Sequence, residues 1–243
     1  LVLYTGTPCQ IAGLRNFLER EYENLITADV ICHGVPSQAY FNKYIQGLER
    51  KFQGTILNFS FRSKNNRGWS LAGEYTIKSK AKCKKRKLYY FNSYYYYYFL
   101  EGSIYRESCY NCIYANIDRV SDFTLGDFWG IEGLHVKFDT ERGCSLVTTN
   151  TTKSKRIFSE LDMNFKEVTL QEAVKHNAQL IEPSRKLSSR EKRLKEYESE
   201  TYEVINNNFL KQNRKEILTA RMKYMIPYKV KNALLKIKYK IEM

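Results

Sequence analysis

The stretch that decides the fold is Leu1-Val2-Leu3-Tyr4-Thr5-Gly6-Thr7-Pro8-Cys9-Gln10, an apolar run that leads into a turn. The run predicts a short β-strand, which Gly6 and Pro8 bring to an end. Apolar residues then recur at helical spacing from Ile11 to Tyr22, so a helix should follow the turn. Strand, loop and helix in this order are typical of an α/β fold.

The same order repeats at once. Residues Leu25–Ile31 predict a second strand, which ends at Cys32 and a Gly-Val-Pro turn. Ser37 then caps a helix whose apolar stripe extends to Phe52. The repeat favours an α/β sheet with functional loops at the carboxyl ends of its strands.

From Ile56 the pattern changes. Residues 56–62 and 71–77 alternate with period two around a turn at 65–68, which predicts a hairpin or meander. A basic loop is expected at 78–87. The tyrosine run at 94–98 is expected to have one stripe facing the core and its other rings exposed.

The second half of the chain is expected to be mainly helical. Residues 145–149 predict one more strand, helical patterns dominate from Thr151, and the chain beyond Pro183 is charged. We therefore expect an α/β domain with a mixed sheet at 1–182 and a basic helical tail at 183–243.

Composition limits the classes of protein to consider. Of the 243 residues, 43% are hydrophobic, which suffices for a globular core. The sequence contains no run of about 18 apolar residues, so no membrane-spanning helix is predicted. Because the chain opens at Leu1 and directly on a strand-like run, we expect it to be a piece of a longer protein.

The net charge of +14 is unevenly distributed. Residues 183–243 hold 16 Lys or Arg against 7 Asp or Glu, and seven of the ten residues from Lys78 to Lys87 are basic. Such a surplus suits nucleic acid, anionic lipid or an anionic cofactor, and it also arises from solvated lysine-rich faces. No aromatic–basic motif accompanies the charge, so no nucleic-acid partner is expected.

Four cysteines in loop-like surroundings are the candidate metal ligands. Cys9 and Cys32 each follow a predicted strand, and Cys109 and Cys112 form a Cys-x-x-Cys. If the two strands are parallel neighbours, both sulfurs reach one edge of the sheet, and the Cys-x-x-Cys needs only to fold over it. Four thiolates are the number that tetrahedral zinc or a four-iron cluster requires.

The spacing leaves both metals open. Structural zinc sites usually combine two close pairs, whereas Cys9 and Cys32 are isolated; His33, beside Cys32, is typical of a polar loop residue. The spacing thus favours an iron–sulfur cluster without excluding zinc. Cysteines of this kind indicate a protein of a reducing compartment. Of the other cysteines, Cys83 is expected to be exposed or half-exposed and Cys144 to be packed.

One short motif suggests another class of protein. Pro8-Cys9-Gln10 matches the nucleophile loop of cytosine-5 DNA methyltransferases. However, Glu23-Asn24 comes too soon after it to be their Glu-Asn element, no Gln-x-Arg-x-Arg follows, and the Cys-x-x-Cys would have no role. A match of three residues is too weak to support this alternative.

Several longer motifs together resemble one family. In order along the chain they are Thr5–Leu14, Cys32–Ser37, Phe61–Lys64 with Gly68-Trp69, Cys109–Ala115 and Arg119–Gly130. They resemble the coenzyme F420 hydrogenase/dehydrogenase beta-subunit family, from Leu1 to about Thr151 and more weakly to about residue 190.

The resemblance implies an electron-transfer oxidoreductase that relays electrons between an iron–sulfur cluster and a flavin or related hydride carrier. It implies one [4Fe–4S] cluster on Cys9, Cys32, Cys109 and Cys112. It also implies FAD beside the cluster, near Thr5, Gly6, Arg119, Asp122, Gly126 and Asp127. No residue is assigned as a catalytic acid or base.

The sequence departs from this family at both ends. Members often carry an amino-terminal portion, sometimes ferredoxin-like, so the expected partner is such a domain or a separate redox protein. The tail beyond Pro183 resembles the bacterial branch linked to polysaccharide biosynthesis. The expected location is cytoplasmic. The amphipathic basic segment 222–241 is expected to dock on its own protein, and peripheral contact with an anionic membrane is the alternative for this segment. The alternative is a non-enzymatic zinc-binding module whose basic tail binds a partner.

Overall fold

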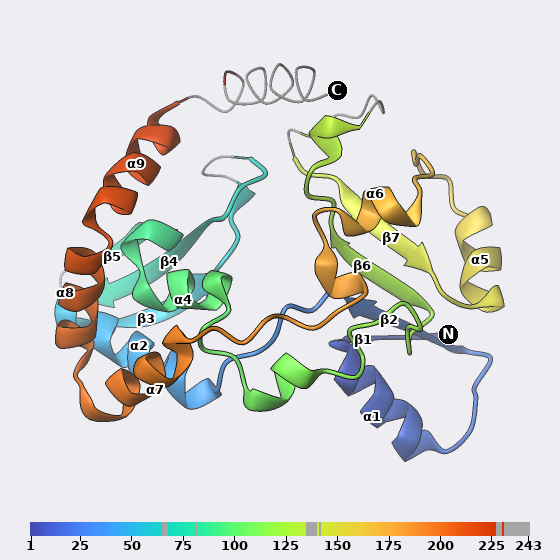
Figure 1. The fold of residues 1–243 in the computed structure, drawn as a ribbon, viewed down its shortest axis with the longest axis horizontal. Coiled ribbons are helices and arrows are strands. Elements are labelled where there is room, and N and C mark those ends of the chain that lie inside the picture. The colour runs from blue at the N-terminus through green and yellow to red at the C-terminus, as the bar shows by residue number, and fades with distance from the viewer. Residues whose placement is uncertain (65–67, 81, 135–139, 141, 227–229, 231–243) are drawn as a thin grey trace. The chain divides into compact units, whose positions relative to one another are not determined.

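The computed structural model describes residues 1–64, 68–80, 82–134, 140, 142–226 and 230 (Figure 1). The chain forms two compact units, and each is discontinuous in sequence. Unit 1 comprises Leu1–His33 and Glu107–Ser184, and unit 2 comprises Gly34–Arg106 and Arg185–Met243. The chain therefore passes between units next to the expected boundary at residue 183, and also after His33 and after Arg106.

Unit 1 contains a four-stranded sheet in the order β1-β2-β6-β7. β1, β2 and β6 run parallel, and β7 is antiparallel to β6. This mixed sheet confirms the predicted α/β class. Its strands are β1 (Val2–Gly6), β2 (Leu25–Val30), β6 (Phe123–Asp127) and β7 (Ser145–Thr149).

The helix expected after the first strand is α1, which begins at the proline of the opening stretch. Pro8 occupies the first helical position, where a missing N–H costs nothing, and the Thr7 N–H donates to Gln10 Oε1 at 2.8 Å. The helix ends at Leu18, earlier than expected, because Glu19 adopts a left-handed φ of 57°. The other helices of unit 1 are α5 (Thr152–Ser159), α6 (Leu170–Val174) and the short 3-10 segments Glu107–Asn111, Ile131–Gly133 and Ala178–Leu180.

Unit 2 contains an antiparallel sheet of β3 (Gly54–Ser60), β4 (Ala72–Ser79) and β5 (Cys83–Tyr89). The predicted hairpin of β3 and β4 is confirmed, although residues 65–67 of its turn lie outside the described residues. The expected basic loop at 78–87 is wrong, because most of it lies in β4 and β5. Leu88 of β5 is buried, while lysines on this edge strand pair through their backbone and keep their ammonium groups in water.

Helices and aromatic rings complete unit 2. As predicted, Ser37 caps α2 (Gln38–Phe52), its Oγ accepting a hydrogen bond from the Tyr40 N–H at 3.2 Å. The expectation of exposed rings in the tyrosine run is wrong, since in α4 (Tyr94–Glu101) only Tyr97 is not fully buried among the five tyrosines. These rings pack with α2, β4 and α8, and burial raises the pKa of Tyr44 well above its usual value.

The helical character expected beyond Pro183 is confirmed up to residue 226. This region forms α7 (Ser189–Ser199), α8 (Tyr202–Gln212) and α9 (Arg214–Met225), and a 3-10 segment at Tyr90–Asn92 packs against α9. Of the amphipathic segment predicted at 222–241, all but residues 222–226 and 230 lie outside the described residues.

Gly47 of α2 tests the packing of unit 2. A Cβ at this position would lie 2.1 Å from Cγ of Tyr202 in α8. We therefore expect Gly47→Ala to lower the free energy of unfolding by about 1–3 kcal/mol, although alanine is the better helix former. Gly13→Ala in α1 is the matched control, because a Cβ there would meet nothing within 4 Å. This substitution should raise the free energy of unfolding by up to about 1 kcal/mol. Urea unfolding followed by circular dichroism measures both, and equal effects would contradict the packing argument.

Candidate functional site

Two of the predicted metal ligands follow the ends of paired strands in unit 1. Gly6 of β1 pairs with Asp29 of β2 in parallel register. Cys9 and Cys32 come three residues after Gly6 and Asp29, respectively. Both loops therefore leave the sheet at the same edge, which is where α/β proteins commonly place their ligands.

Cys9 lies in the first turn of α1 and is exposed. Its Sγ is 3.1 Å from the Thr7 hydroxyl oxygen, and Gln10 holds the turn by accepting hydrogen bonds from Thr7. A Cβ on Gly6 would lie 3.1 Å from Gln10 Oε1, so glycine gives this cap its room. The Thr-Gly-Thr-Pro-Cys-Gln motif is thus a strand-to-helix turn that presents one thiol.

The Cys-x-x-Cys belongs to the same unit. Cys109 lies in the 3-10 segment Glu107–Asn111, and Cys112 follows it, its carbonyl accepting from the Ala115 N–H at 3.2 Å. Both are partly buried, as is Cys32, and none of the four candidate ligands is in a disulfide.

Arg119 connects this loop to the end of β2. One guanidinium nitrogen, Nη1, donates to the Tyr114 carbonyl at 3.1 Å, two residues after Cys112. The other, Nη2, donates to Asp29 Oδ1 at 3.0 Å and to the Val30 carbonyl at 3.3 Å, two residues before Cys32. Both loops are therefore attached to a single side chain.

This connection is buried. The side chains of Arg119 and Asp29 are 2% and 0% exposed, and Arg119 Nε also donates to Thr124 of β6 at 3.1 Å. The second carboxylate oxygen of Asp29 has no hydrogen-bond partner in the part of the chain that the structure describes. Sequence reasoning missed Asp29, although an aspartate within the apolar run Leu25–Ile31 was a usable signal.

Four of the six residues expected beside a flavin lie at the carboxyl ends of strands. Thr5 and Gly6 end β1, and Gly126 and Asp127 end β6, so these four lie at the edge that carries Cys9 and Cys32. Gly126 also allows close packing, since a Cβ there would lie 2.5 Å from Cδ1 of Ile31. Arg119 contacts the same edge through the Val30 carbonyl, whereas Asp122 precedes β6 at its other end.

The ligand set of four cysteines stays a prediction. Among the described residues, no three His, Cys, Asp or Glu side chains form a group that could hold a metal ion. What the donors offer is their chemistry, since all four thiols belong to one unit and Arg119 attaches the Cys-x-x-Cys loop to the end of β2. Cys83 is exposed as expected, and Cys144 is partly buried.

Asp122 is a buried carboxylate with a full set of partners. Its Oδ2 accepts from the Thr27 N–H at 2.8 Å and from the Thr27 hydroxyl at 2.9 Å, and its Oδ1 accepts from the Thr151 hydroxyl at 2.9 Å. Lys153 Nζ lies 3.5 Å away. Burial raises the pKa of Asp122, but these partners outweigh it, so the net pKa lies below its ordinary value. Asp122 thereby joins β2, β6 and α5.

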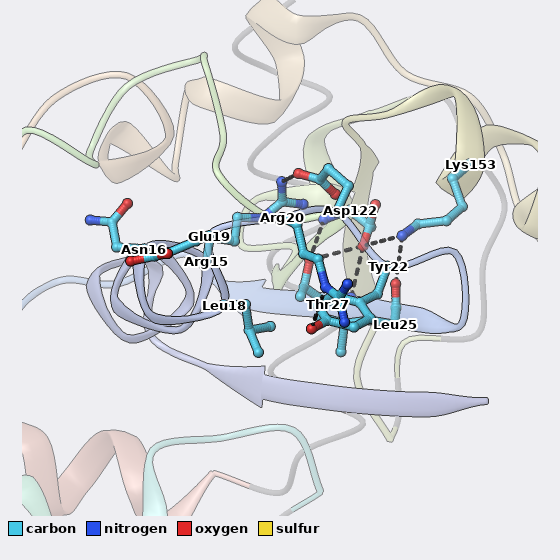
Figure 2. Close-up of a pocket in the computed structure, with 11 residues that line it drawn as sticks. Arg15, Asn16, Leu18, Glu19, Arg20, Tyr22, Leu25, Thr27, Asp122 and Lys153 are labelled. Atoms are coloured by element: carbon cyan, nitrogen blue, oxygen red, sulfur yellow. Dashed lines mark hydrogen bonds and ion pairs between the residues drawn. The ribbon is translucent and has the colours of Figure 1, made fainter.

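A pocket of about 470 Å³ adjoins Asp122, at the carboxyl end of α1 (Figure 2). Its cations face partners, since Arg15 pairs with Glu21, Arg20 Nε donates to the Tyr22 hydroxyl, and Lys153 pairs with Asp122. Together with Glu19, the lining residues comprise three cations and three carboxylates, so the charge of the pocket favours neither an anionic nor a cationic ligand. None of the candidate metal ligands lines it.

Asp122 gives the stability of unit 1 a pH dependence. Because its folded pKa is depressed, this carboxylate stabilises the fold above its unfolded pKa of about 3.9, and the stabilisation is lost as pH falls through the lower folded pKa. We expect Asp122→Asn to lower the melting temperature at pH 7 and to flatten its fall below about pH 4. Thermal melts across pH measure this, with Asp162→Asn on the exposed surface as the control. A variant curve parallel to the wild type would exclude the role of Asp122.

Comparison with known proteins adds the family to this geometry. A search of curated proteins finds no match. The family model for the carboxyl terminus of the coenzyme F420 hydrogenase/dehydrogenase beta subunit matches residues 1–175. The matched segment contains all four candidate cysteines, the Arg119–Asp29 pair and the whole sheet of unit 1. The chain therefore belongs to the coenzyme F420 hydrogenase/dehydrogenase beta-subunit family.

Proposed function

We propose that this chain is an electron-transfer subunit of an oxidoreductase, in which Cys9, Cys32, Cys109 and Cys112 ligate one [4Fe–4S] cluster. The observation that carries the proposal is the pairing of Gly6 with Asp29, because it directs the Cys9 and Cys32 loops to the same sheet edge. The Arg119 connection supports it, since it attaches the Cys-x-x-Cys loop to the end of β2.

The second cofactor of the proposal is FAD beside the cluster, near Thr5, Gly6, Gly126 and Asp127. Family membership supports a redox cofactor. A cluster exchanges single electrons and a flavin exchanges one or two, so the pair would connect a two-electron donor or acceptor to a one-electron partner. In this proposal Arg119 and Asp122 act on the cofactors indirectly, because both side chains are buried among protein partners.

Within this site the protein would supply orientation and electrostatics. Cys9 lies in the first turn of α1, where the helix dipole favours negative charge such as that of a thiolate-ligated cluster. The buried Arg119 pairs with Asp29, so it fixes the backbone at Val30, two residues before Cys32, without adding net charge there. The helix N-terminus thus favours negative charge at this edge, and Arg119 fixes the position of the loop that carries Cys32. The expected partner is a redox protein or a ferredoxin-like domain of the same polypeptide.

The ligand assignment is tested by anaerobic purification and metal analysis. We expect a brown protein with iron and acid-labile sulfide, and we expect Cys112→Ser to abolish cluster retention. Cys83→Ser is the matched control, since Cys83 is an exposed thiol of unit 2. Equal iron content in both variants refutes the ligand set, and a colourless protein with stoichiometric zinc supports the zinc-binding alternative. Flavin fluorescence released on denaturation tests for FAD.

The role of Arg119 is tested by Arg119→Lys. Lysine keeps a charge for Asp29 but cannot donate in the fixed fork that reaches Tyr114, Val30 and Thr124 together. We expect the variant to fold and to retain several-fold less iron after reconstitution than the wild type. Arg156→Lys on the exposed face of α5 is the control. Wild-type iron content in Arg119→Lys, with a normal circular dichroism spectrum, would show that the connection is dispensable.

A further inference from the structure

The two units carry opposite net charge. Unit 1 has 10 Lys or Arg against 16 Asp or Glu, a net charge of −6, whereas unit 2 has 30 against 10, a net charge of +20. The whole basic surplus of the chain is therefore in the unit that lacks the candidate redox site. A surplus of this size attracts polyanions, whatever unit 1 binds.

Helix α9 of unit 2 presents a second apolar stripe besides the one that docks it. Ile217 and Ala220 are buried, and Tyr224 packs against Tyr89 and Phe91. On another face, Leu218, Met222 and Met225 are 50%, 61% and 82% exposed. Their spacing of four and then three residues aligns them along the helix. Docking on unit 2 accounts for the first stripe only.

Exposed cations flank the second stripe. At 100° per residue, Arg214 and Arg221 project on one side of it and Lys215 on the other, and all three are exposed. An exposed row of Leu and Met bordered by Lys and Arg offers an apolar contact for acyl chains and cations for anionic headgroups. No helix in the described ranges is long and apolar enough to cross a membrane.

We propose that α9 is a membrane-interface helix that attaches unit 2 to an anionic lipid surface. The cations of unit 2 supply charge complementarity to the headgroups, and Leu218, Met222 and Met225 insert among the acyl chains. Nucleic acid fits less well, because its phosphates would use the cations and leave this stripe exposed. The inference is independent of the proposed redox function.

The test is flotation of the full chain with vesicles. We expect binding to vesicles of equal parts phosphatidylglycerol and phosphatidylcholine, little binding to phosphatidylcholine alone, and a steep loss with added salt. The triple variant Leu218→Gln, Met222→Gln, Met225→Gln should bind at least tenfold more weakly without unfolding, since all three side chains are exposed and glutamine is a good helix former. Val204→Gln, at an exposed position of α8, is the matched control.

A second variant separates charge from insertion. Arg214→Gln, Lys215→Gln, Arg221→Gln should weaken binding by about a hundredfold, at roughly fivefold per cation. The proposal is overturned if the wild type does not float with phosphatidylglycerol vesicles. It is equally overturned if the apolar triple variant binds as tightly as the wild type, because α9 would then act only through charge, as it would with nucleic acid.

Discussion

The guanidinium of Arg119 joins two segments near it in sequence to the end of β2, where Asp29 is 90 positions away. It contacts the end of β2 through Asp29 and Val30, the loop after the Cys-x-x-Cys through Tyr114, and β6 through Thr124. Breaking a buried ion pair by removing one partner typically costs about 3–5 kcal/mol, because the other charge stays buried. The positions of the loops that carry Cys32 and Cys112 thus depend on one side chain.

The two units are stabilised in different ways. In unit 1, polar side chains link the strands, with Arg119 bonded to Thr124 of β6 and Asp122 immediately before the same strand. In unit 2, aromatic rings from α2, α4 and α8 form the core, whose energetics follow from buried apolar area and ring geometry. The net charges of −6 and +20 extend this contrast to the surface. On our proposals, unit 1 carries the redox chemistry and unit 2 attaches to the membrane.

Much of the fold could be predicted because the local signals were strong. Pro8 and Ser37 set the starts of α1 and α2, and the apolar run from Leu25 set β2. The prediction of a loop at 78–87 was wrong. Seven basic side chains suggest a solvated loop, but an edge strand also exposes its side chains while its backbone pairs with the neighbouring strand. The prediction of exposed rings in the tyrosine run was wrong because a helix that is packed on several sides buries more than one stripe of side chains.

By itself, the sequence determined the α/β class, the strand-to-helix turns, the cysteine motifs and, through these motifs, the family. These properties are local, since each depends on residues within a few positions of one another. The tertiary structure alone decided that residues 34–106 pack with 185–226, that Gly6 pairs with Asp29, and that Arg119 reaches both Tyr114 and Val30. It also decided which stripe of α9 is buried and which is left exposed. Some of these contacts join residues far apart in sequence, such as Lys43 and Tyr197, which are 154 positions apart, so no local pattern encodes them.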